Sequence, residues 1–463
     1  MNIIRSLVKK FYTLLYFNFT IFSFGISQEI PEEFIEYDTY YFSLDHGLNW
    51  DTNTSFGPIR FQSTLKSDTT EANGLNIKTQ FGLHSLNDAI ALYGYGHFTY
   101  KKHFYGYLYP RIVNDIDAFP RYSGIPMDIS RGGFNSGETD LSGIGFQNDW
   151  ITMQIGRGRE SWGAGNDIQL ALSNNSPPYD YGMLGLDFGK LKVKYFHGFL
   201  ESTSSQINRY MTARGIEWTN QKSMVVGLSE TVIYSGENRP LDIGYLNPMA
   251  THLEIELNDR LNIVGANNAN AVWQASIDWV AASKLRLSGN FLFDEFVIDK
   301  VEKDAGKEHG FAYSLRLSYC LNNNLNLFLT NIKVGTPTFR HGQGTNNFVI
   351  RNKPLGWVYG SDGQEISFGA NYYNQRNLFI KVKSGLRELG EESIINRPYD
   401  AYADYLKGPF PSGNMEEIVF LYSGLRWWWK PNIQLLGDFD WQSDGELELK
   451  VGVNTYLSKN VGL

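Results

Sequence analysis

Apolar and polar residues alternate along most of this chain, and this alternation predicts its secondary structure. In Phe311–Tyr319 the odd-numbered residues are aromatic or Leu, and the even-numbered residues are Ala, Ser or Arg. In Leu447–Asn454, Leu and Val alternate in the same way with Glu, Lys, Gly and Asn. A repeat of two residues is that of a β-strand, whose successive side chains point to opposite faces. Each segment is therefore predicted to be a strand with one apolar and one polar face.

The same pattern predicts about eighteen strands. A strand with two unlike faces fits a soluble sandwich, where the apolar face meets a second sheet. It also fits an outer-membrane barrel, where the apolar face meets lipid and the polar face lines the lumen. The predicted strands are 76–84, 89–100, 104–114, 139–147, 150–157, 181–188, 190–200, 209–218, 224–234, 271–281, 285–294, 310–319, 325–334, 367–373, 378–387, 417–429, 433–441 and 447–457.

The lengths of the connections distinguish these two architectures. Connections after even-numbered strands are short, as at Asn148–Asp149 and Gly189. Every long connection follows an odd-numbered strand: 115–138, 158–180, 235–270, 295–309, 335–366 and 388–416. Short turns at one end and long loops at the other are typical of bacterial outer-membrane barrels. We therefore predict an all-β, antiparallel outer-membrane barrel of about 18 strands in a Gram-negative bacterium.

Aromatic residues cluster at the predicted short-turn ends. They are Tyr100, Phe104, Trp150, Trp218 and the triplet Trp427, Trp428 and Trp429. Trp favours the membrane–water interface, where its ring is half apolar and its N–H is hydrated. The triplet could also form a platform for a carbohydrate, but its place beside a short turn favours a periplasmic girdle.

The N-terminus has the pattern of a targeting segment. Arg5, Lys9 and Lys10 precede the apolar stretch Phe11–Phe24, which is too short to span a membrane as a helix. We predict a signal peptide over 1–27, an N-terminal periplasmic or lumenal segment over 28–75, and the transmembrane β-barrel over 76–463.

Composition excludes several classes of function. The net charge of −8 argues against nucleic acid as a partner, because phosphate binding needs a basic surface. Cys320 is the single cysteine, and the eight histidines show no ligand spacing, so no metal or other cofactor is predicted. No nucleophile motif, phosphate loop or acid/base pair at diagnostic spacing is present, so the chain is predicted not to be an enzyme.

Two loops hold the densest mixtures of polar and aromatic residues. The first loop carries Arg157, Arg159, Glu160, Trp162 and Asn166 between closely spaced glycines. The second carries Trp357 and Tyr359, which could stack on a polysaccharide or pack within the loop. Arg, Asn and Glu can hydrogen-bond sugar hydroxyls, and aromatic rings can stack on sugar faces. The same residues could instead fix a loop inside the lumen. These seven are the candidates for polysaccharide binding or for a loop plug, and IQLALS (168–173) is a candidate inward-folded hairpin.

The first loop also carries a family resemblance. Its residues GRGRESWGAGN and LSNNSPP, together with GYLNPM at Gly244–Met249, resemble segments of the Wzi-type capsule-assembly outer-membrane proteins. The resemblance implies an eighteen-stranded barrel whose lumen is occluded by long extracellular loops. It also implies a surface lectin that binds capsular or exported polysaccharide and helps its assembly or attachment at the cell surface.

An alternative function follows from the polar inner faces of the predicted strands. Lys190, Lys192, Lys194, Arg286 and Lys450 could line the lumen of an outer-membrane porin or transporter for small solutes or oligosaccharides. Both alternatives have outer-membrane lipid as a partner. The sequence specifies neither the sugar nor the oligomeric state.

Overall fold

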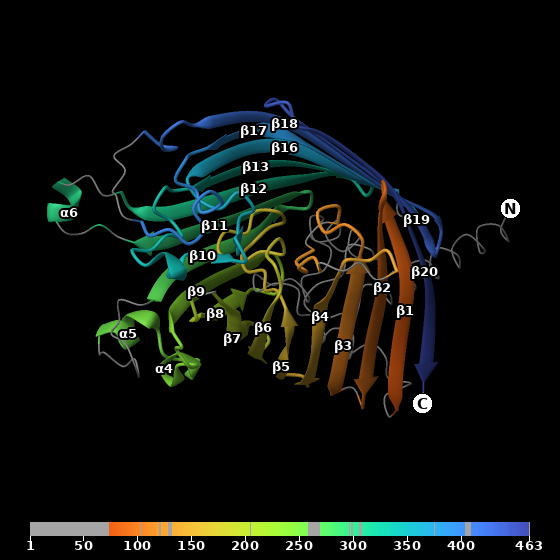
Figure 1. The fold of residues 1–463 in the computed structure, drawn as a ribbon, viewed down its shortest axis with the longest axis horizontal. Coiled ribbons are helices and arrows are strands. Elements are labelled where there is room, and N and C mark those ends of the chain that lie inside the picture. Colours follow the sequence, from red (N-terminus) through yellow and green to blue (C-terminus); the bar gives the residue numbers. More distant parts are fainter. Residues whose placement is uncertain are drawn as a thin grey trace.

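A closed antiparallel β-barrel of eighteen strands makes up most of the protein (Figure 1). The computed structural model describes residues 74–462 apart from 102, 120–121, 128–131, 204, 258–268, 296, 298–299, 305–307, 375 and 403–408. The predicted signal peptide and nearly all of the predicted segment 28–75 therefore lie outside the described residues. Each strand pairs with its neighbours in sequence order, and β20 closes the barrel by pairing with β1.

All eighteen predicted strands are confirmed. The barrel strands are β1 (Leu75–Leu86), β2 (Ala89–Tyr100), β3 (Phe104–Val113), β4 (Ser136–Gln147), β5 (Ile151–Gly158), β6 (Tyr179–Asp187), β7 (Leu191–Ser202), β8 (Ile207–Thr219), β9 (Met224–Glu237), β10 (Ala269–Ala282), β11 (Leu285–Glu295), β12 (Gly310–Asn322), β13 (Leu325–Val334), β16 (Gly363–Tyr373), β17 (Leu378–Leu389), β18 (Glu416–Lys430), β19 (Ile433–Gln442) and β20 (Leu447–Gly462). The long connections all leave the barrel at the same end, which in such barrels is extracellular.

Smaller elements lie within the long loops. They are α4 (Ile243–Leu246), α5 (His252–Leu257), α6 (Lys300–Asp304), the 3-10 turn η2 (Gly344–Asn346) and the hairpin of β14 (Val349–Ile350) and β15 (Lys353–Pro354). Within the described part of the chain, no helix has both the length and the apolar character needed to cross a membrane.

The two faces of each strand meet different surroundings. On β12, Leu315, Leu317 and Tyr319 are exposed on the outer face, whereas Ser314, Arg316 and Ser318 are buried on the lumenal face. The same alternation sorts the aromatic triplet, because Trp427 and Trp429 are exposed while Trp428 is buried beside Tyr373 and Phe379. The girdle prediction therefore fits Trp427 and Trp429 but is wrong for Trp428, which faces the lumen.

One loop folds over the outside of the barrel. On β8, Ile216 and Trp218 are exposed on the outer face, so Arg214 points outward as well. Arg214 and Glu230, an outward residue of β9, are nevertheless buried, with 3.2 Å between Arg214 Nε and Glu230 Oε2. The segment that carries α4 and α5 covers them, and Figure 1 shows both helices outside the barrel wall beside β8 and β9.

Named contacts fix this segment, residues 238–257, to the outer face. The Tyr245 ring of α4 stacks on Tyr234 of β9, with 4.6 Å between the ring centroids. The backbone oxygen of Tyr245 accepts a hydrogen bond from Tyr195 Oη at 2.9 Å. The backbone N–H of His252 donates to Glu230 Oε1 at 3.0 Å, and its Nδ1 lies 2.8 Å from Tyr245 Oη. We call residues 238–257 the outer strap.

Candidate functional site

The loop after β5 folds into the lumen as a hairpin, which we call the plug hairpin (159–178). Trp162 and Leu172 form an antiparallel bridge, and Ile168, Leu170 and Leu172 are fully buried against the inner wall. The Asn290 side chain of β11 anchors the hairpin, accepting from the Ala164 N–H at 2.7 Å and donating to the Ala164 oxygen at 3.0 Å and the Ile168 oxygen at 3.2 Å. The segment IQLALS is therefore inside the barrel.

Buried charges hold the base of the plug hairpin. The Arg159 guanidinium forms an ion pair with Asp140 of β4, and its Nε donates to the Ser176 oxygen at 2.8 Å. Glu160 pairs with Lys194 of β7 and accepts from Trp162 Nε1 at 2.8 Å. Each of these side chains except Lys194 and Asp140 is at most 2 % exposed, so removing one partner would leave a charge or a donor buried without compensation.

The second predicted cluster packs against the first. Trp357 is 4 % exposed, and its backbone N–H donates to the Leu170 oxygen at 3.0 Å. The Arg387 guanidinium of β17 lies 3.4 Å from the centre of the Tyr359 ring, and burial raises the pKa of this phenol to about 12. Of the two interpretations of these aromatics, packing rather than exposure holds for Trp357, because the loop that carries it turns into the lumen and joins the plug. Tyr359 is partly buried against the same cluster.

Close backbone packing explains one glycine at this junction. A Cβ on Gly356 would lie 1.7 Å from the Leu170 oxygen, so a larger residue would separate the two loops. Six of the seven predicted residues, namely Arg159, Glu160, Trp162, Asn166, Trp357 and Tyr359, therefore lie in or beside the plug.

Arg157 lies apart from this group, on the outer rim of the barrel. Its Nη1 is 3.1 Å from Asp180 Oδ2, and its Nε donates to the Thr139 oxygen at 2.9 Å. The Arg157 side chain is 20 % exposed and that of Asp180 is 63 % exposed. Of the seven predicted residues, Arg157 is therefore the one whose charged group lies at the rim rather than in or beside the plug.

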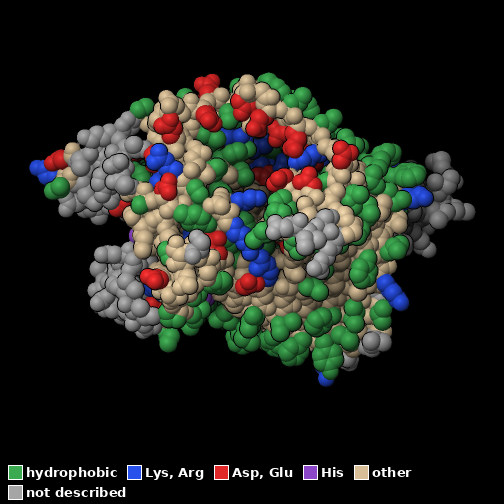
Figure 2. All heavy atoms as spheres, in the orientation of Figure 1, with side chains coloured by type: hydrophobic (Ala, Val, Ile, Leu, Met, Phe, Trp, Pro, Cys, Tyr) green, Lys and Arg blue, Asp and Glu red, His purple; other side chains and the backbone are tan. Residues whose placement is uncertain are grey.

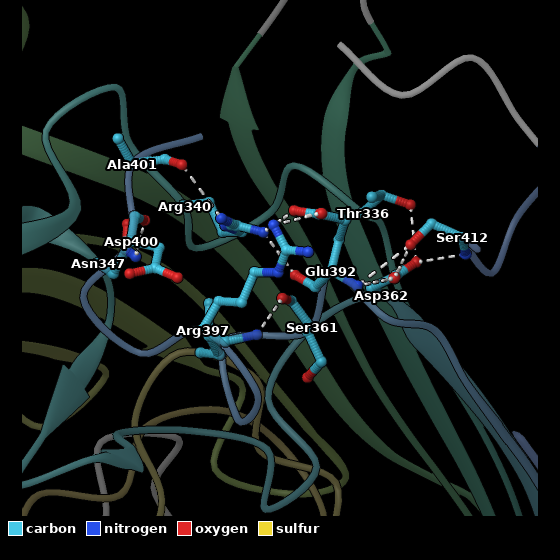
Figure 3. A network of polar contacts seen from close by, with 12 residues as sticks. Thr336, Arg340, Asn347, Ser361, Asp362, Glu392, Arg397, Asp400, Ala401 and Ser412 are labelled. Carbon is cyan, nitrogen blue, oxygen red and sulfur yellow. Dashed lines mark hydrogen bonds and ion pairs between the residues drawn. The ribbon is translucent and has the colours of Figure 1, made fainter. Parts of the chain in front are cut away.

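The loops after β13 and β17 join above the plug, and we call their described residues 335–362, 390–402 and 409–415 the mouth assembly. Asp362 is its centre (Figure 3). The Asp362 carboxylate accepts from Thr336 Oγ1 at 2.8 Å, from the Ser412 N–H at 3.0 Å, from the Ser412 hydroxyl, and from the Glu392 N–H at 3.1 Å. One fully buried side chain therefore links three loop segments.

A second set of contacts extends the mouth assembly toward its tip. Arg340 pairs with Glu392 and donates to the Glu392 backbone oxygen at 2.7 Å, and Arg397 pairs with the same carboxylate at 2.9 Å (Figure 3). The Asn347 amide donates to the Pro398 oxygen at 3.2 Å and to the Asp400 oxygen at 3.0 Å. Because the acceptors at Glu392, Pro398 and Asp400 are backbone oxygens, these bonds fix the path of the loop after β17.

The β14–β15 hairpin presents a polar tip at the mouth. Arg351 and Asn352 have φ values of 49° and 62°, the left-handed conformations of a tight two-residue turn. The Arg351 N–H donates to Glu201 Oε2 at 3.1 Å, and its side chain donates to the Ser123 oxygen at 3.1 Å. Asn352 and Lys353 are exposed. The sequence does not predict this turn, because Arg is uncommon at positive φ and Asn352 alone is a weak signal.

The inner wall formed by β16–β20 carries charged side chains that remain partly exposed. Lys381 Nζ lies 2.6 Å from Asp167 Oδ2 of the plug hairpin, and Lys383 Nζ lies 2.6 Å from Glu365 Oε1. Arg426 Nη1 lies 2.8 Å from Asp438 Oδ1, and both side chains are about one-fifth exposed. Figure 2 shows acidic side chains along the upper rim of the face in view and basic side chains in the hollow beneath it.

Comparisons with known proteins identify the fold. No family model and no curated protein matches the chain. Among solved structures, the chain is similar to Wzi of Escherichia coli, described as an outer-membrane, carbohydrate-binding β-barrel involved in group 1 capsule assembly. This match has 10 % identity and a TM-score of 0.61, and it covers 94 % of this chain and 99 % of Wzi. The chain is an outer-membrane β-barrel.

A second match is OprD of Pseudomonas aeruginosa, with 10 % identity and a TM-score of 0.43, covering 84 % of this chain and 95 % of OprD. This likeness is too distant to bear on function. Among the residues that the structure describes, no group of three or more His, Cys, Asp or Glu side chains could hold a metal ion.

Proposed function

We propose that this barrel is a surface lectin that binds capsular or exported polysaccharide and helps its assembly or attachment at the cell surface. The observation that carries the proposal is the mouth assembly, in which two long loops are joined by buried ionic and backbone contacts above an inserted plug. A binding surface fixed in advance loses little conformational entropy when it takes up a ligand. The E. coli barrel with the same fold is described as carbohydrate-binding, which supports this proposal.

The polar tip of the β14–β15 hairpin is the proposed contact with polysaccharide. Asn352 and Lys353 are exposed there, and the backbone of the turn is held by Glu201. The rim pair of Arg157 and Asp180 offers a second group of donors and acceptors. The buried candidates Arg159, Glu160 and Trp162 support this surface by holding the plug, and we propose no direct sugar contact for them.

Replacing both exposed residues of the tip, Asn352→Ala with Lys353→Ala, is expected to weaken polysaccharide binding by roughly tenfold. A hydrogen bond to a charged group contributes about 1.5–3 kcal/mol. The loss of one such bond at a part-exposed site therefore weakens binding by roughly tenfold. The measurement is calorimetric titration of purified protein with the host's own exported polysaccharide. Lys222→Ala, an exposed lysine in a short turn at the opposite end, is the matched control and should bind normally. Equal affinities of the two variants would contradict the placement of the site.

A porin for small solutes or oligosaccharides is the second candidate, favoured by the part-exposed charges on the inner wall. Lys381, Lys383 and Arg426 remain 17–28 % exposed inside the barrel, which indicates contact with water. Planar-bilayer recording of the unaltered protein distinguishes the candidates. A steady open conductance supports the porin, and a closed barrel that binds polysaccharide supports the lectin.

A further inference from the structure

The outer strap buries an ion pair together with Tyr245, Ala250 and Ile255 on its barrel side, and its outer side is largely apolar. Two of its charged residues, Arg239 and Asp242, are at most 3 % exposed and lie 3.2 Å apart, and Glu254 is half-buried. Its exposed large hydrophobic side chains are Leu241 at 43 %, Ile243 at 71 %, Leu246 at 39 %, Met249 at 80 % and Leu253 at 55 %, and its exposed polar residues, among those described, are the uncharged Asn238 and Asn247. This is the reverse of the arrangement in a loop surrounded by water, where charged groups face outward.

The outer strap also lies at the height of the membrane. Arg214 is five residues from Thr219, the short-turn end of β8. At about 3.3 Å per residue and a tilt of about 40°, Arg214 lies roughly 13 Å from that end, inside an apolar band about 25 Å tall. Below Arg214 the apolar band is made by Ile216 and Trp218, which are exposed on the same face.

A charged pair interrupts that band on the strands beneath the outer strap. From Arg214 upward, the outward residues of β8 are Arg214, Thr212 and Tyr210, and those of β9 are Glu230, Val232 and Tyr234. A charged pair at this depth is costly in lipid unless it is covered. The strap covers the pair, and its own apolar surface continues the band of Ile216 and Trp218.

We infer that the outer strap is a lipid-contacting surface, with Ile243, Leu246 and Met249 among the acyl chains of the outer leaflet. Lipid is the inferred partner of this surface because the outer strap is continuous with the apolar band, which already faces lipid. The segment GYLNPM (Gly244–Met249), which the proposed lectin function leaves without a role, supplies most of α4 and two of these contacts, Leu246 and Met249. The inference is independent of whether the barrel binds polysaccharide.

Spin labels on single cysteines test this inference in the full-length protein. Ile243→Cys and Met249→Cys would be made in a Cys320→Ser background, because Cys320 is the single native cysteine. After reconstitution in phosphatidylcholine vesicles, power saturation compares collisions with oxygen and with a water-soluble nickel chelate. Both labels should favour oxygen by at least about threefold over a label at Val301→Cys in α6, which is 76 % exposed on another loop. Leu315→Cys on the outer face of β12 gives the lipid reference.

Nickel accessibility at Ile243 and Met249 equal to that at Val301 would overturn the inference. Dipolar broadening at Met249 that disappears on dilution with unlabelled protein would also overturn it, because a second copy would then occupy the surface instead of lipid. Both substituted side chains are exposed, so folding is expected to be preserved, and the shift in gel mobility on boiling checks it for each variant.

Discussion

Replacing Gly163–Ala171 by a short Gly-Ser linker is expected to open the barrel to ions, raising its conductance by at least roughly tenfold. An eighteen-stranded barrel leaves an aqueous channel unless something fills it. The segment removed includes Ile168 and Leu170, which are buried against the inner wall. Arg159, Glu160 and Trp162 remain, so the base of the loop keeps its ion pairs. Single-channel recording in planar bilayers measures the effect.

Trp162→Phe is the matched control for the shortened plug. Phe keeps an aromatic ring near Phe196 but loses the donor to Glu160, a hydrogen bond of 2.8 Å in the native protein. This variant should stay closed and lose about 1 kcal/mol of stability. A shortened protein that conducts no better than the native one would show that the mouth assembly closes the barrel without the plug hairpin.

The barrel wall could be predicted from sequence because its pattern is local. Lipid and lumen impose opposite polarity on successive residues, as in Phe311–Tyr319. The restriction of the long loops to one end of the strands then indicated which end is extracellular. Burial of a polar residue on the wall was less predictable. Arg214 and Glu230 occupy outward positions, where alternation alone places them in lipid, and a segment distant along the chain covers them.

The candidate site was predicted in composition but not in arrangement. The loop with Arg159, Glu160 and Trp162 was identified, and its inward fold was one of two interpretations. Its contact with Trp357 could not be predicted, because it depends on a hydrogen bond between two loops about 190 residues apart. The role of Asp362 was missed for the same reason, since its partners Ser412 and Glu392 belong to another loop. In the sequence, an acidic residue followed by a glycine, as at Asp362 and Gly363, is typical of an ordinary turn.

Asp362→Ala is expected to loosen the loop after β17 around Glu392 and Ser412, at a cost of several kcal/mol. The substitution removes the acceptor of the Thr336 and Ser412 hydroxyls and of the Ser412 N–H, and it leaves the Glu392 N–H with Ser412 Oγ, at 3.2 Å, as its remaining acceptor. Each buried unsatisfied donor costs about 1–3 kcal/mol, and water entering the opened loop recovers part of that sum. Hydrogen–deuterium exchange of 390–402 should therefore accelerate by at least roughly a hundredfold.

The barrel wall should withstand the same substitution, because no strand-to-strand hydrogen bond within the described residues runs through the Asp362 side chain. Exchange in β16 and β17 and the gel shift on boiling should therefore match those of the native protein. Glu391→Ala is the matched control, since the Glu391 carboxylate accepts from the exposed Asn414 amide at 2.7 Å. Exposed contacts of that kind contribute less than about 1 kcal/mol. If the two variants protected 390–402 equally, the buried carboxylate of Asp362 would not be what joins the loops, and the fixed extracellular surface required for the proposed lectin would need another origin.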